Sequence, residues 1–140
     1  FGLNLPQIVS IASETGYNRE LADRLWDNTT TRESMLLSPM LTDPAAFAIE
    51  DARRRVAEVP AAEVADILCH SLLKRAPYAW ELAEELVETR PGEFGLYTGL
   101  RLAFNIYSSD PARALALAEK GGDNRLALSL AEEARYLLGE

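Results

Sequence analysis

The stretch DILCHSLLKRAPYAWELAEEL, residues 66–86, decides the fold of this chain. It is typical of two helices joined by a tight corner at Pro77, because apolar residues recur at helical spacing on both sides of the proline. Strand signals are missing: alternating β-branched runs are few, and the chain contains no Asn-Gly or Asp-Gly hairpin turn. The pattern therefore predicts an all-α protein.

Similar helix boundaries recur outward from this stretch in both directions. Asn18 and Thr31 are expected to cap helices, Pro39 to kink a helix or end it early, and the pairs Asp43-Pro44 and Asp110-Pro111 to start helices. We predict helices over residues 5–14, 19–27, 32–41, 44–58, 60–75, 78–89, 94–107, 112–120 and 124–138, the last of them capped by Asp123.

The connections between these helices are short, which predicts that successive helices run antiparallel. Units of two helices come at about 30–40 residues, which is the repeat length of helical solenoids. The units are not similar to one another in sequence, so this period rests on helix length and proline placement. No linker or low-complexity segment interrupts the pattern, and we expect residues 1–140 to form a single domain.

Composition and charge exclude several classes of function. No run of about 18 apolar residues is present, so no transmembrane span is expected. The single cysteine, Cys69, excludes an internal disulfide, fits a reducing cytoplasm, and with the single histidine gives no cluster of metal ligands. We therefore expect a cytoplasmic protein with no metal and no cofactor. No leader pattern opens the chain, and residue 1 is Phe, which is typical of a processed form or part of a longer protein.

The net charge of −8, from 22 acidic and 14 basic side chains, bears on the partner. Nucleic-acid partners are usually met by a basic surface, because neutralising phosphates supplies most of the non-specific affinity. The overall balance therefore argues against tight DNA binding, while a local basic groove stays possible.

Two segments carry a family resemblance. NRELADRLWDNTTTRESMLLSPMLTDP, residues 18–44, and EVADILCHSLLKRAPYAWELAEEL, residues 63–86, resemble successive units of the bacterial DNA alkylation repair family, and the resemblance extends over residues 18–107. It implies a superhelix of antiparallel HEAT-like helix pairs. It also implies a DNA glycosylase lineage whose active members excise N3- and N7-alkylated bases with a carboxylate, tryptophans and basic residues in a concave groove.

The resemblance assigns site residues position by position. The family's catalytic aspartate matches Asp66, whereas the tryptophan implied four residues earlier falls at Ala62. The paired arginines implied near the start of the next buried helix fall around Thr98 and Gly99, and the nearest base is Arg101. A carboxylate would stabilise the positive charge left on the sugar when a cationic base departs. Most of the implied aromatic and basic partners are absent.

Two polar patterns are candidate sites. Asp66, His70 and Lys74 are spaced four residues apart, which places them on one face of a helix. They form either a site that faces a groove or an ordinary solvated stripe, and we favour the solvated stripe. Residues 53–55 are three arginines, which form either a patch that binds phosphates or a solvated helix face. We favour the solvated face, because Glu50–Arg54 and Asp51–Arg55 have the (i, i+4) spacing of favourable ion pairs.

The remaining polar and aromatic patterns favour structural roles. A Cys69–His70 dyad is not expected, because adjacent residues point about 100° apart around a helix. Acidic residues of the 78–89 helix are interpreted as a solvated face, and the large aromatic residues as packing between helices. The acidic residues are Glu81, Glu84, Glu85 and Glu88, and the aromatic residues are Trp26, Trp80, Tyr78, Tyr97, Phe104 and Tyr107.

Two function hypotheses follow. The first, which the acidic charge, the missing aromatic and the missing paired arginines favour, is a non-catalytic scaffold with a degenerate glycosylase site that binds a protein, a peptide or DNA in its concave surface. The alternative is a glycosylase that acts on damaged DNA with Asp66 as its catalytic residue. The candidate binding residues are Arg53, Arg54, His70, Lys74 and Arg101.

Overall fold

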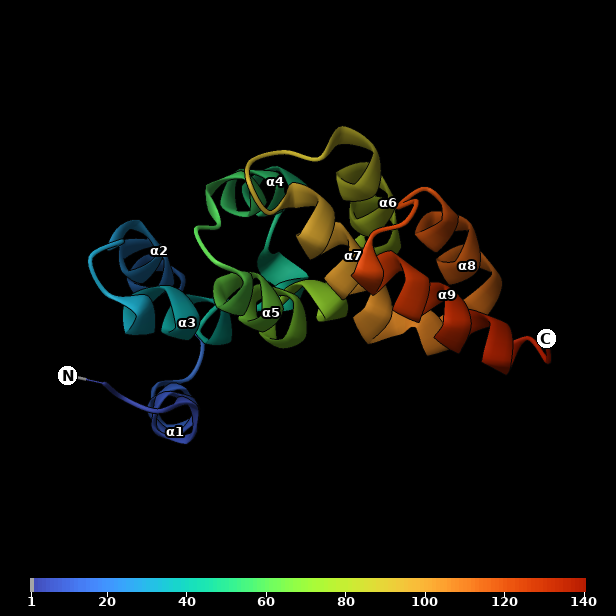
Figure 1. The fold of residues 1–140 in the computed structure, drawn as a ribbon. Coiled ribbons are helices and arrows are strands. Elements are labelled where there is room, and N and C mark those ends of the chain that lie inside the picture. The colour runs from blue at the N-terminus through green and yellow to red at the C-terminus, as the bar shows by residue number, and fades with distance from the viewer. Residues whose placement is uncertain (1) are drawn as a thin grey trace.

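The computed structural model describes residues 2–140 and confirms the all-α class: over these residues it contains helices and no strand. The termini lie at opposite ends of an elongated row of helices (Figure 1). The α-helices are α1 (Leu5–Thr15), α2 (Arg19–Asp27), α3 (Arg32–Met40), α4 (Ile49–Glu58), α5 (Ala62–Ser71), α6 (Ala79–Thr89), α7 (Gly95–Ile106), α8 (Pro111–Glu119) and α9 (Arg125–Leu137).

Most predicted helix boundaries are confirmed, and three are corrected. Asp43-Pro44 starts only the 3₁₀ turn η1 (Pro44–Ala46), and α4 begins later, at Ile49. The expected 60–75 helix ends at Ser71 and is followed by the 3₁₀ turn η2 (Leu73–Arg75). The last helix is capped by Asn124, not Asp123, because the Asn124 side chain accepts hydrogen bonds from the first-turn amides.

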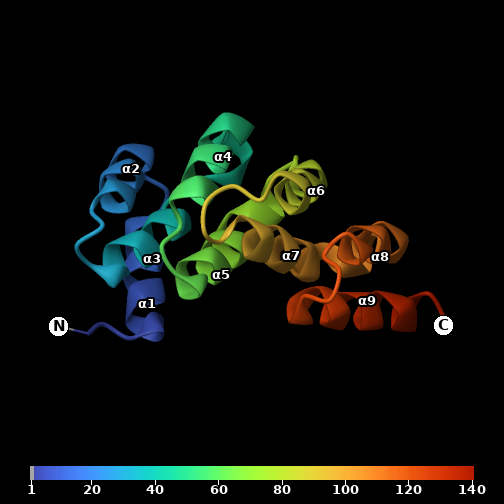
Figure 2. The ribbon, with the colours of Figure 1, turned by 45° about the horizontal axis from the view of Figure 1, so that its top comes forward.

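The helices form two rows (Figure 2). The odd row is α3, α5, α7 and α9, in which each helix contacts the next. The even row is α2, α4, α6 and α8, joined by the ion pairs Asp23–Arg55, Arg53–Glu85 and Glu84–Arg113. Short connections carry the chain from one row to the other and back.

Contacts within the even row define its register. Arg19 pairs with Asp51 at the start of α2 and α4, and the Trp26 indole N–H donates to Glu58 Oε1 at their ends, 2.8 Å away. The start of α2 therefore lies beside the start of α4 and the end beside the end, so the two helices run parallel. Side-chain hydrogen bonds between neighbouring helices of either row join residues 29 to 32 apart.

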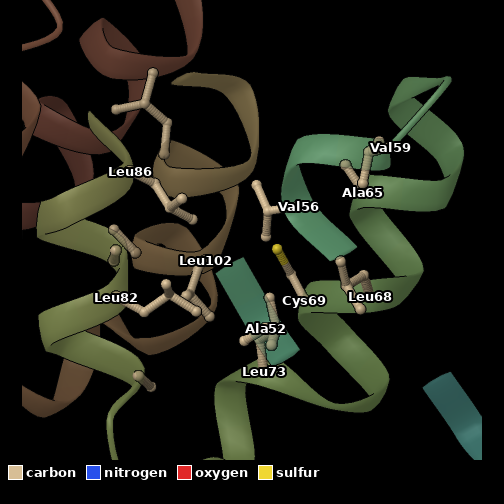
Figure 3. Close-up of a cluster of buried hydrophobic side chains, with 14 of the residues drawn as sticks. Ala52, Val56, Val59, Ala65, Leu68, Cys69, Leu73, Leu82, Leu86 and Leu102 are labelled. Carbon is tan, nitrogen blue, oxygen red and sulfur yellow. The ribbon is translucent and has the colours of Figure 1, made fainter. Parts of the chain in front are cut away.

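The hydrophobic core lies between the rows. Figure 3 shows side chains from α4, α5, α6 and α7 meeting there, among them Val56, Leu68, Leu86 and Leu102, each fully buried. Burial of such side chains stabilises the fold by about 1.5–3 kcal/mol each relative to leaving them exposed. Because core residues come from both rows, removing one helix pair would expose apolar surface on its neighbours.

A polar cluster is built into the even row at its N-terminal end. We call it the buried arginine cluster: Arg55 and Asp23 with Ser38, Trp26 and Phe47. The Arg55 side chain is 1% exposed, pairs with Asp23 Oδ1 at 2.5 Å and donates to Ser38 Oγ at 3.2 Å. Its guanidinium carbon lies 4.8 Å from the Phe47 ring centroid and 5.3 Å from that of Trp26. The expectation of a solvated arginine face is therefore wrong for Arg55.

The first helix is the least buried. Ile8 is the only residue of α1 that is buried, although α1 is amphipathic and carries Val9 and Ile11 on its exposed surface. Over residues 2–140, no helix has both the length and the apolar character that a bilayer span requires.

Candidate functional site

The polar residues of α5 and α7 meet on the exposed side of the odd row. Asp66 Oδ1 accepts a hydrogen bond from the Tyr97 hydroxyl at 2.5 Å and lies 3.3 Å from Arg101 Nε. Arg101 also donates to the Tyr97 hydroxyl at 3.4 Å. We call Asp66, Tyr97, Arg101 and Phe104 the exposed arginine cluster; the side chains of Asp66 and Arg101 are 44% and 33% exposed.

Aromatic rings hold the Arg101 guanidinium in place. Its central carbon lies 5.6 Å from the Tyr97 ring centroid and 5.7 Å from that of Phe104, both within cation–π range. Arg101 Nε is buried and has no aligned hydrogen-bond partner, so its contact with Asp66 is electrostatic and not a well-directed hydrogen bond. A surface depression lined by Asp66, His70, Arg101, Phe104 and Asn105 opens beside this pair.

Tyr97 reports on the electrostatics of the cluster. Partial burial raises the pKa of the Tyr97 phenol, and the hydrogen bond to Asp66 raises it further because a phenolate would face a carboxylate. Arg101 lowers the pKa of Tyr97, because its positive charge and its hydrogen bond favour the phenolate. The phenol therefore stays protonated at neutral pH and remains a hydrogen-bond donor to Asp66.

His70 and Lys74 lie at the end of α5, near the depression. His70 lines it, and Lys74 Nζ lies 3.2 Å from His70 Nδ1. Lys74 belongs to η2, because α5 has already ended at Ser71. The structure thus brings four predicted site residues onto one side of the odd row: Asp66, His70, Lys74 and Arg101.

Arg53 and Arg54 lie elsewhere, on α4 in the even row. The Arg53 guanidinium makes a two-pronged pair with Glu85 of α6 at 2.7 and 2.8 Å, and Arg54 approaches Asp51 at 3.8 Å. Neither arginine lines the depression beside Asp66. The predicted (i, i+4) pairs do not form, since the arginines take (i, i+3) partners or acids on other helices.

The acidic face predicted on α6 has partly structural roles. Glu84 makes a two-pronged pair with Arg113 of α8, which lowers the pKa of the Glu84 carboxyl, and Glu85 pairs with Arg53. Glu81 and Glu88 are exposed, as a solvated face requires.

The tryptophans do not surround Asp66. Trp26 is 2% exposed within the buried arginine cluster. Trp80 donates to Ser109 Oγ at 3.1 Å and lies under the Arg113 guanidinium. Ala62, at the position of the implied tryptophan, is in the first turn of α5.

The positions of the implied paired arginines are inaccessible. Thr98 is buried, and its hydroxyl donates to the Phe94 carbonyl one turn earlier. Gly99 faces α6 so closely that an added Cβ would lie 2.9 Å from Leu86 Cβ. A longer side chain at either position would collide with the core, and the basic residue of α7 that reaches Asp66 is Arg101, one turn from Tyr97.

Two chemistries receive no support from the described residues. Cys69 is fully buried, its thiol lies 3.5 Å from the Thr98 carbonyl, and burial raises its pKa far above the ordinary value, so it remains a thiol. Within residues 2–140, no three His, Cys, Asp or Glu side chains are grouped as metal ligands.

Sequence reasoning assigned Tyr97 only to packing, and its contact with Asp66 is the main feature that it missed. The separation of 31 residues between Asp66 and Tyr97 falls within the helix-pair period of about 30–40 residues that the sequence predicts, but that period does not say which residues of the two helices meet. Comparisons with protein-family profiles, curated proteins and solved structures found no match for this chain. The resemblance to the DNA alkylation repair family therefore remains an expectation.

Proposed function

We propose that this chain is a non-catalytic binding scaffold: a short HEAT-like array of helix pairs whose odd row presents the binding face, with a degenerate glycosylase site at Asp66. The inter-helix spacing of 29 to 32 residues and the parallel register of α2 and α4 support a repeated helix-pair architecture. Stacked pairs of this kind are used as extended binding surfaces.

One observation carries the non-catalytic part of the proposal: Asp66 already has a cation and a phenol as partners within the protein. A glycosylase carboxylate must stabilise the positive charge that develops on the sugar as the base departs, so its own negative charge must be free to face that sugar. At Asp66, Arg101 Nε lies 3.3 Å away and the Tyr97 hydroxyl donates to the same oxygen. The carboxylate would stabilise a sugar cation only after losing those partners.

Charge pairing elsewhere supports the same proposal. Arg53 and Arg113 are engaged by carboxylates of α6, so these guanidinium groups are partly neutralised and bind phosphates less strongly. A net charge of −8 also makes the chain as a whole repel a DNA backbone.

The glycosylase remains the second candidate because of one specific observation. The depression beside Asp66 is lined by Arg101, His70 and the aromatic ring of Phe104, which is the combination of carboxylate, cation and aromatic that such chemistry uses. In this alternative, Asp66 is the catalytic carboxylate and damaged DNA is the partner.

Excision of methylated bases tests the two candidates. DNA treated with a methylating agent is incubated with wild type, with Asp66→Asn and with Glu88→Gln, a matched removal of one exposed charge on α6. The scaffold proposal predicts the same background release of 3-methyladenine and 7-methylguanine in all three. Release by wild type and Glu88→Gln, but not by Asp66→Asn, would overturn it.

Binding to a duplex with and without a stable abasic analogue completes the test. The scaffold proposal predicts no lesion preference at low or moderate salt. Salt-sensitive binding that is tighter to the lesion would favour the glycosylase lineage.

A further inference from the structure

A groove separates α1 from the end of α5, on the side of the molecule nearest the N-terminus. It has a volume of about 510 Å³. Its apolar walls include Leu5 and Val9 of α1, Met40 of α3 and Ile67 of α5. Leu5 and Val9 lie one turn apart on the same face of α1 and remain 39% and 48% exposed, so the α1 wall of the groove is an open apolar surface.

The charge of this groove differs from that of the whole chain. The titratable side chains that line it are His70 and Arg75, apart from the phenol of Tyr17, and no carboxylate lines it. Lys74 lies beside His70, and neither Lys74 nor Arg75 forms an ion pair within residues 2–140. The groove is therefore apolar with a basic end, and it suits an apolar segment that carries carboxylates.

Such a segment is present at the opposite end of the chain. The exposed face of α9 carries Leu128 and Tyr136, which are 55% and 77% exposed. Glu132 lies between them at helical spacing, and Glu133 and Glu140 line the same shallow surface together with one base, Arg135. The outer face of α9 is thus an acidic, apolar helix surface that packs against nothing within the described residues.

We propose that the α1–α5 groove of one molecule binds the outer face of α9 of a second copy. Leu128 and Tyr136, two turns apart on α9, would pack along the apolar walls at Val9 and Ile67, and the α9 carboxylates would meet the basic end at Arg75. Packing of an amphipathic helix into an apolar groove is a common recognition mode. The complementary charges favour this orientation over its reverse.

The geometry decides the kind of assembly. In Figures 1 and 2, α1 and α9 lie at opposite ends of the molecule, so a chain cannot fill its own groove. The two surfaces also differ from each other, so the contact is head-to-tail, and each added copy leaves one groove and one α9 face unoccupied. Such a contact builds open-ended chains of molecules instead of closed dimers.

Two single substitutions and their mixture test this proposal by sedimentation velocity over a range of protein concentrations. Wild type is expected to show a mass that rises with concentration past that of two 15.5-kDa chains. Val9→Glu blocks the groove and Tyr136→Glu blocks the α9 face, so each variant alone should remain a monomer. An equimolar mixture should reach two chains and stop, because the first variant keeps its α9 face and the second keeps its groove.

Ile11→Glu is the matched control, because Ile11 is exposed on α1 and does not line the groove. It should assemble like wild type, and circular dichroism should show equal helix content in every variant. The proposal is overturned if wild type stays monomeric at millimolar concentration, if Ile11→Glu assembles no better than Val9→Glu, or if the mixture stays monomeric. None of these outcomes touches the scaffold proposal, which the excision and DNA-binding measurements test separately.

Discussion

Two arginine clusters in this molecule use the same groups in different surroundings. In each, a guanidinium pairs with an aspartate on a neighbouring helix, meets a hydroxyl and lies against two aromatic rings. Arg55 is 1% exposed within the even row, whereas Arg101 is 33% exposed on the odd row. The comparison teaches that the residue types alone do not separate a structural site from an accessible one.

Burial gives the Arg55–Asp23 pair a structural role. Removal of Arg55 from water lowers its pKa, an effect that Asp23 opposes through its charge and hydrogen bond. The guanidinium remains charged at neutral pH because the ordinary pKa of arginine is so high. The charged guanidinium donates to Asp23 of α2 and to Ser38 of α3, and these two contacts fix α2, α3 and α4 relative to one another.

The largest expected effect comes from Arg55→Ala. It removes a fully buried side chain with its ion pair and ring contacts, and should lower the free energy of unfolding by about 2–4 kcal/mol. The expected loss of stability is smaller than for a fully buried ion pair, because the Asp23 side chain is 41% exposed and can be hydrated. Urea unfolding followed by circular dichroism measures it.

Arg54→Ala is the control for this prediction, since Arg54 is the adjacent residue with a side chain 53% exposed. Its effect should lie within about 0.5 kcal/mol of zero. Equal destabilisation by the two substitutions would show that the buried position of Arg55 contributes nothing of its own, and the comparison of the clusters would fail.

The sequence predicted the helices well because their signals are local. Asn18 caps α2, Asp110 caps α8 and Pro39 lies one residue before the end of α3, and each outcome depends on residues within one turn. The 3₁₀ turn at Pro44 is an exception. There the short turn is followed by Phe47, whose ring lies against the Arg55 guanidinium, a tertiary contact that local patterns do not predict.

The fate of residues 53–55 could not be predicted for the same physical reason. Three adjacent arginines point about 100° apart around a helix, so one of them must face a different environment from the others. Which one is buried depends on where α2 lies, and only the tertiary structure places Asp23 beside Arg55. The grouping of Asp66 with His70 followed from helical spacing, whereas the Tyr97 contact required the packing of α7 on α5.

The surroundings of the buried arginine cluster can also be tested at high pH, through the ionisation of Tyr78. Tyr78 lies beside the buried cluster, where its hydroxyl donates to the Phe47 carbonyl at 2.8 Å, and burial raises the pKa of Tyr78 to about 12. Because the folded pKa lies above the unfolded value of about 10, the contribution to stability is complete below pH 10. It is lost as the pH rises from about 10 to 12.

Tyr78→Phe should lower the free energy of unfolding at neutral pH by about 1 kcal/mol through loss of one hydrogen bond. It should also remove the tyrosine that ionises last from the absorbance titration at 295 nm. The matched control is Tyr17→Phe, since the Tyr17 side chain is 61% exposed. Loss of the latest-titrating phenol in the Tyr17 variant instead would contradict the assignment to Tyr78.

The smallest expected effect is the coupling between Asp66 and Arg101, measured as a double-mutant cycle of Asp66→Ala and Arg101→Ala in urea unfolding. Both side chains are partly hydrated, so the coupling should be about 0.2–1 kcal/mol. A weak coupling would show that Arg101 is easily displaced, so that the hydrogen bond from the Tyr97 hydroxyl is the contact that keeps Asp66 occupied. A coupling above about 2 kcal/mol would place this cluster with the structural one at Arg55, because a carboxylate bound that firmly to its own protein is unavailable to a partner or a sugar cation.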